Sequence, residues 1–123
     1  MPDTKKAKLE KILEELKSIG GITGSAVISK DGLAVASDIS EKDVDTFAAM
    51  SAAIEGAAET AVSELKQGEL KQIIVDADEG KTITISTGDE AILVILAKPT
   101  INLGLVLLGL GKAAGKVSKI LGG

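Results

Sequence analysis

The stretch SAVISKDGLAVAS, residues 25–37, decides the fold. It holds two short runs of β-compatible residues, 25–29 and 33–37, on either side of the turn formed by Lys30, Asp31 and Gly32. An Asp-Gly step between two such runs is a strong local signal for a β-hairpin. The sequence therefore predicts two adjacent antiparallel strands joined by a tight turn.

A helix is expected on each side of this hairpin. Apolar residues recur at helical spacing between charged residues in 9–19, and Gly20-Gly21 follows, which predicts an amphipathic first helix. After the hairpin, Ser40 with Asp43 three residues later forms a capping-box pattern. This pattern opens a long middle helix over residues 41–66, which Gly68 closes.

Three further strand-like runs follow, at residues 70–77, 81–86 and 91–97, separated by turns too short for a parallel crossover. Pro99 ends the last run, and Asn102 can cap a final helix with one apolar face. The order α-β-β-α-β-β-β-α predicts an α+β fold with a five-stranded antiparallel sheet. We expect a three-layer α/β/α sandwich, with the middle helix on one face, the terminal helices on the other, and a single domain over residues 1–123.

Composition excludes most enzyme chemistry. The chain has no Cys, His, Trp or Tyr, and its 14 basic residues are all Lys, so it has no Arg. No thiolate or imidazole can act as nucleophile, base or soft metal ligand, and no arginine finger is available. The net charge of −4 argues against nucleic acid as the main partner. We therefore expect a non-enzyme with no catalytic residue, cofactor or metal.

The charged residues among 1–19 argue against a secretion signal, and no apolar run is long enough to span a bilayer. The expected location is the cytoplasm. Three motif-like fragments carry no function. The GxGxxA match at 109–114 lacks the βαβ context of a dinucleotide site, the acidic turn 76–80 lacks the rest of a calcium loop, and Ser63-x-x-Lys66 lacks the partner motifs of an acyl-enzyme.

The middle helix is uncharged on two sides. One side is large and apolar and is predicted to face the core; it carries Val44, Phe47, Met50, Ile54, Ala58, Ala61, Val62 and Leu65. The opposite side is small, which permits close approach of a second helix. A solvated alanine face is the alternative. We expect a second copy to pack here, with a dimer interface on the middle helix of Ala49, Ala52, Ala53, Gly56, Thr60 and Ser63.

The final helix is rich in glycine. Gly104, Gly111 and Gly115 fall on one edge, which is expected to lie close against the first helix. Outside that edge, a stripe of lysines lies beside two leucines. This surface could be a docking patch for a partner, a patch for an anionic surface, or an ordinary solvated helix face. The stripe and its leucines are Lys112, Lys116, Lys119, Leu105 and Leu108.

Nearly the whole chain resembles the Roadblock family of dynein-light-chain-like proteins and small-GTPase regulators. The resemblance rests on residues 20–24 (GGITG), 26–33 (AVISKDGL), 35–37 (VAS), the Ala-rich segment 47–62 and residues 102–108 (NLGLVLL). It implies a profilin-like fold and a dimer in which the middle helices (41–66) pack together and strands 70–77 pair edge to edge, so that Ile73 and Val75 also belong to the expected dimer interface. It also implies partners such as small Ras-like GTPases or dynein cargo, and no catalytic site.

The expected function is a homodimeric protein-binding module that regulates or scaffolds a small Ras-like GTPase. The alternatives are a structural adaptor subunit of a motor or signalling assembly and a small-ligand sensor domain. The predicted docking surface is a groove between the paired middle helices, with an acidic rim formed by Asp45, Glu55 and Glu59. The competing docking surface is the face of Leu105, Leu108 and Lys112 on the final helix.

Overall fold

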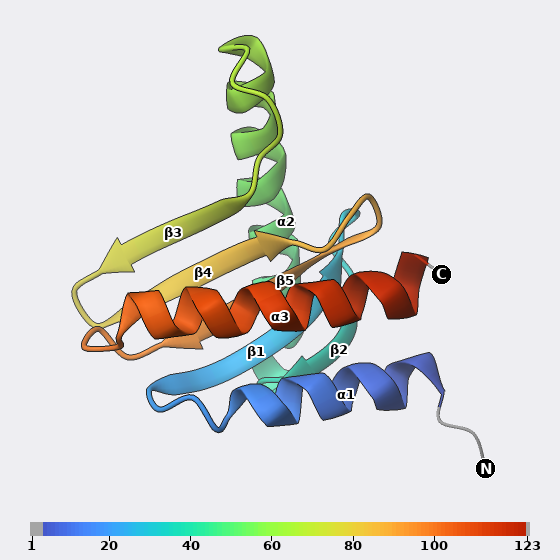
Figure 1. Ribbon diagram of the computed structural model, residues 1–123, viewed down its shortest axis with the longest axis vertical. Helices are drawn as coiled ribbons and strands as arrows, with labels where there is room; N and C mark the ends of the chain where they lie inside the picture. The colour runs from blue at the N-terminus through green and yellow to red at the C-terminus, as the bar shows by residue number, and fades with distance from the viewer. Residues whose placement is uncertain (1–3, 123) are drawn as a thin grey trace.

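The computed structural model describes residues 4–122 and confirms the predicted element order and α+β class (Figure 1). Five antiparallel strands and three helices follow one another as expected. Their bounds are α1 Lys5–Leu16, β1 Ile22–Ser29, β2 Ala34–Asp38, α2 Glu41–Glu64, β3 Gln72–Ala77, β4 Gly80–Ser86, β5 Ala91–Ala97 and α3 Leu103–Gly122.

The sheet has the strand order β2-β1-β5-β4-β3, so β5 lies at its centre. The β5 sequence AILVILA is apolar at every position, as a strand covered on both faces requires, and nearly all of it is buried. The edge strands are β2 and β3. Most residues of β3 are exposed, so this edge has little cover within the chain.

The two faces of the sheet are covered unequally. Helices α1 and α3 lie side by side on one face and build the larger core with residues such as Leu9, Leu93 and Leu110 (Figure 1). The α2 face holds a smaller cluster that includes Ala26, Ala48 and Ile92. The expected three layers are therefore present, and most of the buried apolar side chains lie between α1, α3 and the sheet.

The prediction for the core face of α2 was right for Phe47, which packs against the cluster around Ala48, and wrong for other large side chains. Met50 is 61% exposed and Leu65 is 67% exposed, and Ile54 also reaches solvent. The side toward the sheet carries Ala48 and Ser51, which are small enough for α2 to lie close to β1 and β2. Beyond these strands the C-terminal half of α2 extends past the edge of the sheet (Figure 1). Met50, Ile54 and Leu65 therefore point away from the chain's own core.

The local turn and cap signals are borne out in part. The hairpin turn has Gly32 at φ +91°, a backbone conformation that favours glycine, and the amide of Ser29 donates to the carbonyl of Leu33 at 2.8 Å. Asn102 caps α3, since its Oδ1 accepts from the amide of Leu105 at 3.2 Å. At the start of α2, however, the Ser40 side chain makes no capping hydrogen bond.

The close approach between α1 and α3 depends on Gly109 and not on the predicted glycine edge. A Cβ at Gly109 would lie 2.5 Å from Cδ1 of Ile19, which lies three residues after the end of α1. At Gly111 and Gly115 a Cβ would meet nothing within 4 Å, and both face solvent. These two glycines lower the helix propensity of α3 without permitting a contact within the chain.

We expect Gly111→Ala and Gly115→Ala each to raise the free energy of unfolding by about 0.5–1 kcal/mol, because alanine restricts the unfolded backbone and favours a helix. Urea unfolding followed by circular dichroism measures this change. Gly32→Ala is the matched comparison, and it should destabilise the fold because of its positive φ. Equal effects at all three glycines would contradict this account.

Candidate dimer and partner interface

The outward side of α2 has no charge along five turns. Between residues 46 and 63 the sequence contains two charged residues, Glu55 and Glu59, and no lysine. Glu55 is buried, and Glu59 is directed to Lys30 of the β1–β2 turn, so neither stands on the outward side. A surface helix normally carries charged residues toward solvent. The outward side of α2 therefore resembles a helix face that is buried against a partner.

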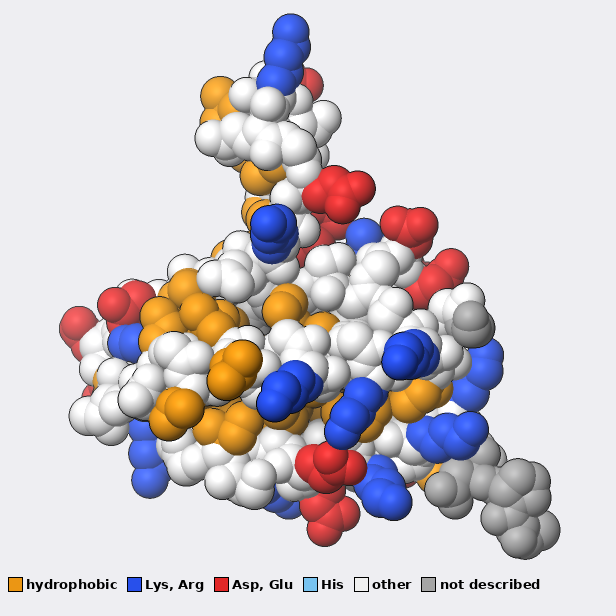
Figure 2. Space-filling model, viewed as in Figure 1, with side chains coloured by type: hydrophobic (Ala, Val, Ile, Leu, Met, Phe, Trp, Pro, Cys, Tyr) orange, Lys and Arg blue, Asp and Glu red, His pale blue; other side chains and the backbone are white. Residues whose placement is uncertain are grey.

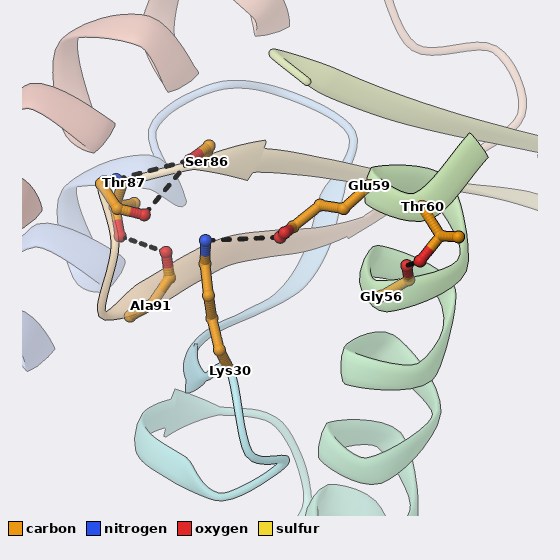
Figure 3. Close-up of polar contacts among 8 residues, drawn as sticks. Lys30, Gly56, Glu59, Thr60, Ser86, Thr87 and Ala91 are labelled. Atoms are coloured by element: carbon orange, nitrogen blue, oxygen red, sulfur yellow. Dashed lines mark hydrogen bonds and ion pairs between the residues drawn. The ribbon is translucent and has the colours of Figure 1, made fainter. Parts of the chain in front are cut away.

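Most of the predicted small row stands on this outward side. Ala53, Gly56 and Ser63 are exposed, and Thr60 Oγ1 donates back to the carbonyl of Gly56 at 3.0 Å (Figure 3). The N-terminal end of the row differs. A Cβ on Gly32 of the hairpin turn would lie 3.6 Å from the Cα of Ala49 and 3.7 Å from the Cβ of Ala52, so both alanines lie beside this turn.

Strand β3 continues the exposed apolar surface at the sheet edge. Ile73 and Val75 pair with Thr84 and Thr82 of β4, on the face of the sheet that α2 covers. Ile73 is half-buried, and Val75 is exposed. The outer edge of β3 has no neighbouring strand among residues 4–122. The predicted interface residues on α2 and β3 therefore share one side of the molecule, next to an open sheet edge.

The predicted acidic rim is not formed by the chain alone. Asp45 is exposed near the start of α2, as expected. Glu55 is only 4% exposed and faces the sheet. Glu59 Oε1 lies 3.3 Å from Nζ of Lys30, which holds it toward the β1–β2 turn (Figure 3). Lys30 was not among the predicted site residues, because a lysine in a hairpin turn gives no sequence signal of a contact with a distant helix.

Burial raises the pKa of Glu55 to about 7. The protonated Glu55 donates to Glu59, and the charge of Glu59 raises the Glu55 pKa further, while Lys30 opposes this shift. The same hydrogen bond and the ammonium of Lys30 lower the pKa of Glu59. Glu55 therefore changes its protonation near neutral pH, beside a cavity of about 330 Å³ that both carboxyl groups line.

This pair makes stability depend on pH. Because Glu55 has a higher pKa folded than unfolded, the folded chain binds more protons between about pH 4.5 and 7, and stability falls as pH rises through that window. Glu55→Gln removes the ionisable group and with it this fall in stability at higher pH. We expect the variant to exceed the wild type in unfolding free energy by on the order of 2 kcal/mol at about pH 8.

Chemical denaturation of both proteins from about pH 4.5 to 8 measures the effect. The difference should shrink as the pH falls, because wild-type Glu55 is then protonated. Glu14→Gln, on the exposed side of α1, is the control and should leave the pH profile unchanged. A constant difference between Glu55→Gln and wild type at every pH would contradict the assignment.

The competing docking residues lie on the opposite side of the molecule. Leu105, Leu108 and Lys112 are exposed on α3, and the sheet separates them from α2. The structure therefore does not bring the two predicted partner sets together. Within residues 4–122, no cluster of three or more acidic side chains is arranged to hold a metal ion. No helix in the same part of the chain is long and apolar enough to cross a membrane.

Comparison with known proteins gives a consistent result. The family model for the Roadblock/LC7 domain matches residues 8–97. An uncharacterized protein of Methanocaldococcus jannaschii is 38% identical over 110 residues, which cover 89% of this chain and 96% of the relative. Among solved structures, Myxococcus xanthus MglB is similar with a TM-score of 0.89 at 18% identity, covering 99% of this chain and 93% of MglB.

The fold is also similar to that of profilin. Acanthamoeba castellanii profilin IB aligns with a TM-score of 0.60 at 19% identity, covering 90% of this chain and 97% of the profilin. This likeness concerns the fold alone, and it agrees with the expected profilin-like arrangement of helices around an antiparallel sheet.

Proposed function

This chain belongs to the Roadblock/LC7 domain family, and from that premise we propose that it acts as a homodimer that regulates or scaffolds a small Ras-like GTPase. Members of the family are generally non-enzymatic regulatory or adaptor domains. The GTPase connection is supported by the similarity to MglB structures. The homodimer and its Ras-like partner form our proposal.

The observation that carries the proposal is the uncharged outward side of α2. Its exposed Met50, Ile54 and Leu65 would be buried if a second α2 packed against them, and each large side chain removed from water contributes about 1.5–3 kcal/mol. Ala53 lies between these large side chains and the small row on the other flank of α2, so it would let the two helices approach closely. A pair of α2 helices can therefore provide the apolar burial that the chain's own sheet does not.

The edge of β3 supports the same dimer. An exposed edge strand with apolar residues tends to pair with another strand, and here the strand carries Ile73, Ile74 and Val75 in a row. Antiparallel pairing of two β3 strands would join the sheets, with the α2 helices together on one side. The part of α2 that extends beyond the sheet would then lie over the joined region.

The partner would be regulated without catalytic residues from this chain. The sequence contains no Arg, so no arginine finger can stabilise the transition state of GTP hydrolysis. Any change in hydrolysis rate would have to come from binding one conformation of the switch segments of the GTPase more tightly than another. The dimer would then act by shifting the conformations of its partner.

Capture experiments with purified, tagged protein test this function. The tagged dimer is mixed with extract of the source organism containing either a non-hydrolysable GTP analogue or GDP. We expect recovery of a small Ras-like GTPase that depends on the nucleotide, followed by reconstitution from the two purified proteins. If no GTPase binds in either state, the regulator proposal fails and the structural adaptor function replaces it.

Charge reversals locate the docking surface. Asp43→Lys with Asp45→Lys changes the exposed acidic start of α2, and should weaken GTPase binding by roughly tenfold or more, because acidic rims steer basic partners. Lys112→Glu with Lys116→Glu on α3 is the comparison and should change GTPase binding little. If only the α3 pair abolishes binding, the docking surface is wrongly assigned to α2.

A further inference from the structure

The charges of the molecule are separated between its layers. Residues 5–17 and α3 together carry eight lysines against three glutamates, a net charge of +5. The remainder of the chain carries six lysines against fifteen acidic residues, a net charge of −9. Although the whole chain is acidic, the layer formed by α1 and α3 is basic. A negatively charged surface would attract this layer and repel the rest, which would orient the molecule.

The outer ridge of α3 combines exposed leucines with lysines. Two leucines, at 61% and 62% exposure, occupy its first half and three lysines its second half, at intervals of three or four residues that keep them in one stripe. Helix α3 contains no acidic residue. Figure 2 shows hydrophobic side chains over the N-terminal half of α3 and a row of basic ones over its C-terminal half. The stripe is Leu105, Leu108, Lys112, Lys116 and Lys119.

The lysines of this layer are mostly available to an external anion. Among residues 4–122, two of the eight take part in ion pairs: Lys116 with Glu15 at 3.4 Å and Lys17 with Asp38 at 3.1 Å. The Lys116 pair joins two exposed side chains, so it contributes little and can open readily. The layer therefore offers both positive charge and accessible apolar side chains on one surface.

We propose that the α1–α3 layer docks on an anionic lipid surface, with Leu105 and Leu108 entering the headgroup region and the lysines contacting lipid phosphates. The surface shape favours a lipid surface over an acidic peptide. The cavity between α1 and α3 measures about 170 Å³, which suits one side chain and not a bound segment. Exposed leucines beside lysines on a helix ridge are the features by which interfacial helices bind membranes.

The proposed dimer would present two copies of the α1–α3 layer to a membrane. Antiparallel pairing of two β3 strands about a twofold axis perpendicular to the sheet keeps the faces of both sheets in register, so both α1–α3 layers lie on the same side. Two weak membrane contacts on one rigid body bind together with higher avidity than either alone. Docking itself depends on the α1–α3 layer and does not require the GTPase.

Vesicle cosedimentation with the purified full chain tests the proposal. We expect binding to phosphatidylcholine vesicles that contain about 30% phosphatidylglycerol, no binding to pure phosphatidylcholine, and loss of binding at high salt. Lys112→Glu with Lys116→Glu should lower the partition coefficient at least roughly 30-fold. Leu105→Gln with Leu108→Gln should lower it roughly tenfold at unchanged charge.

Lys42→Glu with Lys98→Glu is the matched control, since it changes the net charge equally but lies outside the layer, and it should bind vesicles nearly as well as wild type. The proposal is overturned if the protein binds anionic and neutral vesicles equally. It is overturned as well if the α3 double variant and the control double variant lose vesicle binding to the same extent. It is also overturned if no vesicle binds while the α3 pair abolishes GTPase capture, which would assign the layer to an acidic protein partner.

Discussion

Ala53→Lys should convert the wild-type dimer into a single chain at micromolar concentration. Ala53 lies on the outward side of α2, where the proposed dimer brings two helix backbones close together. A lysine there would overpack the contact between the two helices, and its ammonium group would be desolvated, at a cost of about 3 kcal/mol or more. The dissociation constant should rise at least roughly 100-fold, as measured by sedimentation equilibrium.

The matched control for this change is Ala7→Lys. Ala7 is also an exposed helical alanine, but it lies on α1, away from α2 and β3. Its lysine variant should sediment as the wild type does. An Ala53→Lys protein that remains a dimer, or an Ala7→Lys protein that dissociates equally, would show that α2 does not form the interface.

Leu110→Ala should lower the free energy of unfolding by about 3 kcal/mol, since Leu110 is fully buried between α3 and the sheet and its truncation leaves a cavity. Leu108→Ala, two residues earlier on the same helix, is the control. Because Leu108 is 62% exposed, its truncation should change stability by less than about 0.5 kcal/mol. Urea unfolding of a single-chain background such as Ala53→Lys separates folding from association.

The fold was predictable because its signals are local. The Asp-Gly turn, the short loops of the meander and the Asn102 cap each specify one connection, and the helix and strand periods supply the elements between them. The central position of β5 also follows from its unbroken apolar sequence. Local signals were therefore sufficient for the order, the antiparallel sheet and the three layers.

The orientation of α2 was not predictable from the same signals. A hydrophobic pattern identifies a core face when the other side of the helix is charged, but over residues 46–63 the charged residues of α2 are Glu55 and Glu59, and Glu55 faces the sheet. Met50, Ile54 and Leu65 proved to be exposed, while Ala48 and Ser51 approach the sheet. Hydrophobic size alone does not distinguish burial within a chain from burial against a partner.

The buried position of Glu55 was missed for a related reason. Burying a carboxylate is unfavourable unless it is neutralised or paired, so sequence reasoning placed Glu55 at a solvent-exposed rim. In the structure Glu55 can remain protonated because Glu59 accepts its proton in a hydrogen bond, and Lys30 holds Glu59 from another element. A spacing of four residues lets Glu55 and Glu59 meet on one side of a helix, but the contribution of Lys30 depends on the tertiary fold.

Hydrogen exchange at low and high protein concentration tests the proposed dimer most directly. Among residues 4–122, the outer amides of β3 have no strand partner, and the same holds for the outer amides of β2 at the opposite edge. We predict that amide exchange in residues 72–77 slows as the protein concentration rises into the range where the dimer forms. Amide exchange in residues 34–38 should stay unchanged. Equal exchange behaviour of both edges at every concentration would contradict a dimer built on β3.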